Sequence, residues 1–176
     1  MSELRRLSLG DATGLAHALV ARVGVSKALR NLAVKGGVAA HYCLRPGRVS
    51  ADADTWVAPS DLNEMIEALA RSGWTRREES KHASGLVSHS VTVAHAQWPC
   101  DIDVHWTFPG FLGEAGYVFD VLWERRQTMT QAGVEVFIPD RAGAVLISAL
   151  HALRTPVQTP RHAEEFRMLV DVCAGM

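Results

Sequence analysis

The stretch of sequence that decides the fold covers residues 32–54 and reads LAVKGGVAAHYCLRPGRVSADAD. Its apolar start, residues 32–34, predicts a short strand that ends at a pair of glycines, and the apolar positions after the glycines recur at helical spacing. Residues 51–57 alternate between polar and apolar side chains, which predicts a second strand. The expected order is therefore strand, glycine turn, helix and strand.

The glycine turn is a candidate anion site. Gly36 and Gly37 allow the backbone to come close to a ligand, and the first N–H groups of the following helix point toward that ligand. A phosphate suits this geometry, although a turn without a ligand can have the same sequence. The neighbouring Lys35 could supply a counter-charge to phosphate or simply lie at the strand edge.

Two carboxylates lie close together on the second predicted strand. Asp52 and Asp54 are separated by one residue, so both side chains leave the same face, with Cα atoms roughly 6 to 7 Å apart. Carboxylates at this spacing raise each other's pKa, and a hard cation such as Mg²⁺ relieves the repulsion. The same pattern also fits two solvated carboxylates at a strand edge.

A later strand carries a second set of ionisable residues. Asp101, Asp103 and His105 alternate with bulky apolar residues, so their shared face must meet solvent or a cleft. Residues 86–95 also alternate, and we expect them to pair with residues 101–106 as an antiparallel hairpin. For Asp101 we favour solvent, whereas His105 could orient Asp103 or touch a substrate.

The order and spacing of these elements resemble the nucleotidyltransferase superfamily that includes DNA polymerase beta. In that superfamily a strand, a glycine turn and a helix precede an Asp-x-Asp pair, and a third carboxylate follows on a later strand. The sequence is most similar to a group of poorly characterised bacterial nucleotidyltransferases, and more distantly to the small aminoglycoside adenylyltransferases. The segments that carry the resemblance are Val34–Gly37, Tyr42, Arg48–Asp54, Val57, Asp61–Leu62, Leu69, Gly73–Trp74, Ile102–Trp106, Val136–Asp140 and Ala149–Leu153.

The resemblance implies a role for each candidate site residue. Asp52, Asp54 and Asp103 would be the catalytic carboxylates and would hold Mg²⁺ or Mn²⁺ ions that bridge a nucleoside triphosphate. Asp103 could also accept the proton of the acceptor hydroxyl. The residues expected to bind the nucleotide are Gly36, Gly37, Lys35, Arg48 and Ser50, with His105 as a possible accessory residue.

The function implied by the resemblance is nucleotidyl transfer. We expect a Mg²⁺-dependent enzyme that moves AMP from ATP to a hydroxyl of an acceptor, with a small molecule preferred over a protein or an RNA end and an antibiotic as one special case. The alternative is a catalytically inactive nucleotide-binding or regulatory domain of the same fold, because Ala53 and Thr55 are smaller or more polar than the family's usual residues. A metal hydrolase built on Asp101, Asp103 and His105 ranks lowest.

The expected architecture is α+β, a nucleotidyltransferase fold with a mixed sheet flanked by helices and a C-terminal helical extension. Residues 1–108 would form the catalytic core, and residues 109–176 would form a C-terminal strand and helices packed on it. The first helix is expected near residues 11–23, with Asp11 as its N-cap. Helices are also expected after Pro59, after Asp140 and from Pro160, the last with Phe166, Leu169, Val170 and Cys173 facing inward.

Composition narrows the partners. The 176 residues include 18 basic and 19 acidic side chains, for a formal net charge of −1, so we expect neither duplex nucleic acid nor an anionic membrane as a partner. The three cysteines form no disulfide framework or zinc motif, and no signal peptide or membrane span is readable, which favours a cytoplasmic location. The histidine spacings match no compact zinc motif, and the tryptophans are expected in packing.

Overall fold

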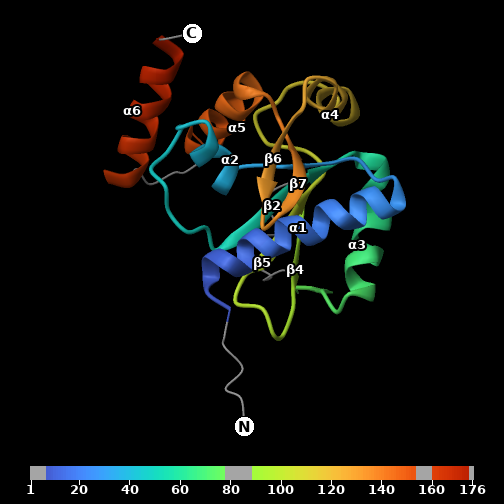
Figure 1. The fold of residues 1–176 in the computed structure, drawn as a ribbon. Helices are drawn as coiled ribbons and strands as arrows, with labels where there is room; N and C mark the ends of the chain where they lie inside the picture. The colour runs from blue at the N-terminus through green and yellow to red at the C-terminus, as the bar shows by residue number, and fades with distance from the viewer. Residues whose placement is uncertain (1–6, 78–88, 154–159, 175–176) are drawn as a thin grey trace.

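The computed structural model describes residues 7–77 and 89–153 and the helix at 160–174 (Figure 1), with only the backbone described at residues 160–162. The helices are α1 (Leu9–Lys27), α2 (Gly36–His41), α3 (Leu62–Arg71), α4 (Ala115–Glu124), α5 (Arg141–Leu153) and α6 (Pro160–Ala174), with a 3₁₀ turn at Pro59–Asp61. The strands are β1 (Asn31–Ala33), β2 (Asp52–Val57), β3 (Thr75–Arg76), β4 (Ser90–Ala94), β5 (Asp101–His105), β6 (Gln127–Gln131) and β7 (Val134–Ile138).

The first helix is longer than the sequence predicts. It begins at Leu9 and ends at Lys27, and its N-cap is Ser8, whose Oγ accepts a hydrogen bond from the Asp11 amide at 3.1 Å. The assignment of Asp11 as the N-cap is therefore wrong. Asp11 instead lies in the first turn, where a carboxylate interacts favourably with the helix dipole.

The five-stranded sheet has the order β1-β2-β5-β4-β3 and is mixed. β2 and β5 run parallel, whereas the other neighbouring pairs run antiparallel, including the hairpin of β4 and β5. This hairpin was predicted, but residues 86–88 of its first arm lie outside the described part of the chain. The mixed sheet flanked by helices confirms the predicted α+β class.

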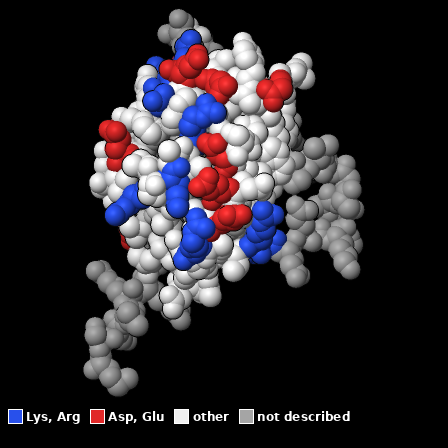
Figure 2. Space-filling model, turned by 90° about the vertical axis from the view of Figure 1, so that its right-hand side faces the viewer, with Lys and Arg blue, Asp and Glu red and all other residues white. Residues whose placement is uncertain are grey.

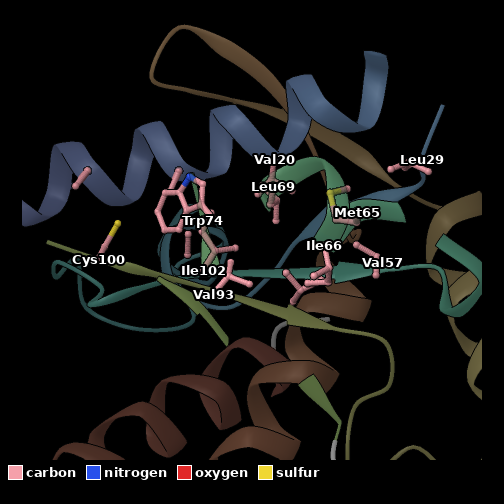
Figure 3. Close-up of a cluster of buried hydrophobic side chains, with 14 residues drawn as sticks. Val20, Leu29, Val57, Met65, Ile66, Leu69, Trp74, Val93, Cys100 and Ile102 are labelled. Carbon is pink, nitrogen blue, oxygen red and sulfur yellow. The ribbon is translucent and has the colours of Figure 1, made fainter. Parts of the chain in front are cut away.

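One face of the sheet is apolar and is covered by α1 and α3. In α3 the buried residues Met65, Ile66 and Leu69 recur at helical spacing and pack with Ala53 and Ile102 of the sheet (Figure 3). Trp74, beyond the end of α3, closes this core beside β4, and its side chain is 1% exposed. Because side chains alternate along a strand, the opposite face of β2 and β5 receives Asp52, Asp54, Asp103 and His105.

That opposite face is apolar at one end only. Beyond the carboxylates, Trp56 packs with Phe108, and α4 and α5 cover this region with Phe119 and Ile147. The polar end of the face therefore stays open while the other end is filled. The prediction that the tryptophans serve packing is confirmed for Trp56 and Trp74, which are fully buried.

The C-terminal part contains two elements that the sequence did not predict, α4 and β6. β6 pairs with β7 in a separate two-stranded sheet, which packs on α1 and β1. The strand at residues 134–138 and the helix after Asp140 were predicted, and Asp140 Oδ1 accepts a hydrogen bond from the Gly143 amide at 2.8 Å.

Of the four residues expected to face inward in the last helix, only Leu169 is buried, with 4% exposed. The prediction is wrong for Phe166, Val170 and Cys173, which are exposed, because α6 meets the body along a narrow side.

The described surface is consistent with the charge balance of the sequence. On the face shown in Figure 2, acidic and basic side chains are interspersed, without an extended patch of one sign. No helix in the described ranges is both long enough and apolar enough to cross a membrane.

Candidate active site

The parallel pairing of β2 and β5 brings the predicted carboxylates together. Asp52 lies opposite Asp101 and Asp54 lies opposite Asp103, so the two strands present their acidic residues in adjacent rows on one face. Neighbouring strands lie about 4.8 Å apart, which is a distance that one cation can bridge. A slip of one residue in either strand would move its carboxylates to the apolar face.

These carboxylates lie in the wall of a cleft of about 510 Å³. Asp52, Asp54 and Asp103 all line it, and so do Lys35, Gly36, Arg48 and Ser50 from the glycine turn and the loop before β2. The other wall comes from α5 and α6 at the C-terminal end of the chain. The residues of that wall are Ser148, His151, Glu165 and Leu169.

Asp54 is the most buried of the three carboxylates, with a side chain 10% exposed. Its Oδ1 lies 2.6 Å from Lys35 Nζ and 3.0 Å from His105 Nε2. Burial alone would raise the pKa of the Asp54 carboxyl, but the hydrogen bond from His105 and the charge of Lys35 outweigh burial and lower this pKa to about 2. Asp54 is therefore an ionised carboxylate held by two partners.

Asp52 and Asp103 have different surroundings. Thr92 Oγ1 on β4 donates a hydrogen bond of 2.5 Å to Asp103 Oδ1, which fixes the orientation of that carboxyl. Burial, and next the charges of Asp103 and Asp54, raise the pKa of Asp52. The neighbouring carboxylates thus add to the effect of burial, and a bound cation would offset their contribution.

His105 belongs to the site more closely than the sequence indicated. Its side chain is 2% exposed, and one ligand atom each from Asp54, Asp103 and His105 lie within 4.8 Å of one another. Among the described residues these three form a potential metal-binding group, which contains His105 in place of Asp52. Asp101 is not part of this group and does not line the cleft; it pairs with Arg77 at 2.9 Å, although its charge contributes to the raised pKa of Asp52. The hydrolase set of Asp101, Asp103 and His105 therefore does not form one group of potential ligands.

The glycine turn places its two glycines differently. Gly36 has a φ of +25° and lines the cleft, where an added Cβ would lie 3.2 Å from Ser50 Oγ. Gly37 instead lines a neighbouring hollow between α1 and β6, close to the Gln131 side chain. The backbone before them is unusual for a residue with a side chain, because Lys35 has φ 57° and ψ −141°.

Arg48 and Ser50 also have partners within the chain. Arg48 forms an ion pair of 3.0 Å with Glu165 on α6, which links the loop before β2 to the C-terminal helix. The Ser50 carbonyl accepts a hydrogen bond of 3.0 Å from Thr13 Oγ1 on α1. Both side chains remain part of the cleft lining.

Sequence reasoning missed the wall formed by α5 and α6. Ser148, His151 and Glu165 gave no signal in the sequence, because their contribution depends on how α5 and α6 pack beside the glycine turn and the loop before β2. The remaining histidines form no zinc group in the described part of the chain. His82 lies outside the described residues, and the side chain of His162 is not described.

The fold and the arrangement of acidic residues define a protein of the nucleotidyltransferase superfamily. The model of a family described as "Uncharacterised nucleotidyltransferase" matches residues 26–175. The chain belongs to this family, which confirms the resemblance found in the sequence and the assignment to the transferases. The comparison with curated proteins gives no match.

Solved structures share the fold at low sequence identity. ANT(2")-Ia in complex with adenylyl-2"-tobramycin is 13% identical, with a TM-score of 0.60 over 92% of this chain and 88% of that one. The lincosamide antibiotic adenylyltransferase LnuA, with lincomycin bound, is 9% identical, with a TM-score of 0.55 over 90% of this chain and 96% of that one. An antigenic nucleotidyltransferase-like protein from Paracoccidioides brasiliensis is 10% identical, with a TM-score of 0.58 over 93% and 76%.

Proposed function

We propose that this protein is a Mg²⁺-dependent nucleotidyltransferase that transfers AMP from ATP to a hydroxyl of a small-molecule acceptor. The observation that carries the proposal is the meeting of Asp52, Asp54 and Asp103 in the wall of one cleft beside Gly36. These aspartates come from strands far apart in the sequence, and a solvated strand edge would not bring them together. The residues match those that the family resemblance implies.

The donor set of the cleft fits a divalent cation. Carboxylate oxygens are the ligands that Mg²⁺ and Mn²⁺ prefer, and the charges of Asp103 and Asp54, which add to burial in raising the pKa of Asp52, are charges that a cation would offset. Asp52 and Asp103 would hold the ion on the open side of the cleft. When bound, such an ion supplies positive charge that stabilises the attacking and leaving oxygens of a phosphoryl displacement.

The residues of the chain then have distinct tasks. The acceptor oxygen attacks the α-phosphorus of ATP, the bond from the α-phosphorus to the bridging oxygen of the β-phosphate breaks, and pyrophosphate leaves. Asp103 accepts the proton of the acceptor hydroxyl, since the hydrogen bond from Thr92 orients its carboxyl and its second oxygen can take the proton. Gly36, Arg48 and Ser50 face the cleft beside these carboxylates and bind the triphosphate.

Two observations support AMP and a small acceptor. Of the solved structures that share the fold, LnuA is a lincosamide antibiotic adenylyltransferase, and ANT(2")-Ia is in complex with adenylyl-2"-tobramycin. The cleft also has a second wall, from Ser148, His151 and Glu165, next to the carboxylates. We place the acceptor against this wall, with residues 1–108 as the catalytic core and residues 109–176 as the part that completes the acceptor side.

The test is transfer from ATP labelled at the α-phosphate, with release of pyrophosphate, across a panel of small hydroxyl compounds. Asp52→Asn and Asp103→Asn should each lower the rate by roughly 100-fold or more, because metal-held charge stabilisation contributes several kcal/mol. Asp101→Asn is the matched control: it removes a carboxylate of the same strand that pairs with Arg77 outside the cleft, and it should keep the rate.

A thermal-shift series separates catalysis from binding. ATP should stabilise the wild-type protein only when Mg²⁺ is present, and Asp52→Asn should lose this stabilisation. Mg²⁺-dependent stabilisation without pyrophosphate release from any acceptor in the panel would favour a nucleotide-binding domain without transferase activity. Stabilisation that is equal with and without Mg²⁺ would contradict the proposed metal role.

A further inference from the structure

The side chain of Lys35 occupies the position of a cation among the candidate metal ligands. Its Nζ lies 2.6 Å from Asp54 Oδ1 and 3.3 Å from His105 Nε2. Asp54, His105 and Asp103 offer potential ligand atoms that lie within 4.8 Å of one another. The ammonium group of Lys35 therefore contacts two of the three residues that could surround an ion there.

This position is built into the fold rather than adopted by a free surface lysine. The side chain of Lys35 is 16% exposed, and Nζ lies 5.5 Å from the centre of the Phe108 ring, in the range of a cation–π contact. The backbone of Lys35 has φ 57° and ψ −141°, a conformation that residues with a Cβ rarely adopt. The turn thus holds a lysine, at a cost in backbone strain, where its ammonium group reaches Asp54.

The charges of the site match one divalent ion. Asp52, Asp54 and Asp103 carry three negative charges when ionised, and Lys35 reduces the formal charge of the group to −2. A single Mg²⁺ or Mn²⁺ neutralises this remaining charge. Two divalent ions beside a retained lysine would instead leave the protein groups with a net positive charge before the nucleotide binds.

We infer that the Lys35 ammonium takes the place that a second metal ion could occupy beside Asp54, so that the site holds one divalent ion per chain, at Asp52 and Asp103. This inference rests on the proposed function, which requires a cation in the cleft. Lys35 acts through Asp54 and is therefore a positioning residue: it neutralises Asp54 and keeps this carboxylate directed into the site. Asp52 and Asp103 then share the single ion with the triphosphate.

The experiment counts Mn²⁺ ions bound per chain in the presence of a saturating ATP analogue that has a methylene group between the α- and β-phosphates. Native mass spectrometry gives the count, and electron paramagnetic resonance shows whether two ions lie close enough to broaden each other's signal. The variant Lys35→Met removes the ammonium but keeps an unbranched side chain. Lys27→Met, at the exposed last residue of α1, removes one positive charge from a position that does not line the cleft and serves as the control.

We expect one Mn²⁺ in the wild-type protein and in Lys27→Met, and two in Lys35→Met, with the second held by Asp54, Asp103 and His105. Two Mn²⁺ ions in the wild-type protein whose signals broaden each other would overturn the inference and leave the proposed function intact, whatever the variant does. A single ion in a folded Lys35→Met protein would also overturn it. No binding of the analogue or of Mn²⁺ to the wild-type protein would instead refute the proposed function.

Discussion

His17 on α1 gives the protein a stability that depends on pH in a predictable way. Its side chain is 4% exposed, and its Nδ1 has no hydrogen-bond partner within the part of the chain that the structure describes. Burial lowers the pKa of His17 from 6.5 to about 4, against the opposing charge of Asp54. The imidazole is therefore neutral in the folded protein at a pH where the unfolded chain already binds a proton.

The size of the effect follows from proton linkage. Well above a pH of 6.5 neither state binds the proton at His17, so the full stability is present. As the pH falls toward 4, the unfolded chain gains the proton and the folded protein resists it, which removes about 3 kcal/mol from the free energy of unfolding by the lower end of this window. That loss is a large fraction of the stability of a typical domain.

The assay is urea unfolding of the wild-type protein and of His17→Leu at several pH values between neutrality and pH 4. The leucine variant cannot titrate at this position. As the pH is lowered from neutrality to 4, the free energy of unfolding of the wild-type protein should therefore fall by about 3 kcal/mol more than that of the variant. His41→Leu, at an exposed position on α2, provides the control for replacing a histidine. A difference between His17→Leu and the wild-type protein that stays constant with pH would refute the reasoning.

Three further predictions concern other parts of the fold. Asp140→Ala should destabilise the protein by about 1 kcal/mol in urea unfolding, because the cap of α5 at the Gly143 amide is lost; an unchanged midpoint would contradict the role of the cap. Leu69→Ala should cost about 3 kcal/mol in the same assay, since a fully buried side chain between α3 and the sheet leaves a cavity, and a loss below 1 kcal/mol would show that the core collapses around it. Arg48→Met should speed amide hydrogen exchange in residues 163–174, because the ion pair with Glu165 holds α6 to the cleft; exchange equal to that of the wild-type protein would show that α6 is held by other contacts.

The sequence predicts the catalytic side of the molecule well because the relevant patterns are local. Alternation in residues 51–57 and 101–106 determines which face each aspartate occupies, and the paired glycines mark the turn before α2. Once both strands are assigned, the face shared by the carboxylates follows from geometry. That β2 and β5 are neighbours was implied only by the family resemblance, since no local signal specifies strand order.

The elements that the sequence missed lack such patterns. β6 consists of the polar run Gln127–Gln131, which has no apolar alternation and gains its order by pairing with β7. α4 is capped by Glu114, whose carboxylate accepts hydrogen bonds from the amides of Gly116 and Tyr117, and glutamate is not among the usual N-cap residues.

The contact between Lys35 and Asp54 was also beyond sequence reasoning. It depends on a backbone conformation that a lysine rarely adopts, so propensity alone would not place the side chain in the site. The wall formed by α5 and α6 depends in the same way on tertiary packing, which sequence patterns along those helices do not specify.

The parallel alignment of β2 with β5 has a consequence for how the protein matures. The paired residues are separated by roughly fifty positions along the polypeptide, and such distant pairings form late because a long loop must close first. A nascent chain that has emerged only through β2 carries two of the three carboxylates and no partner strand to complete them. The β4–β5 hairpin must therefore be synthesised before the three carboxylates can meet on one face of the sheet.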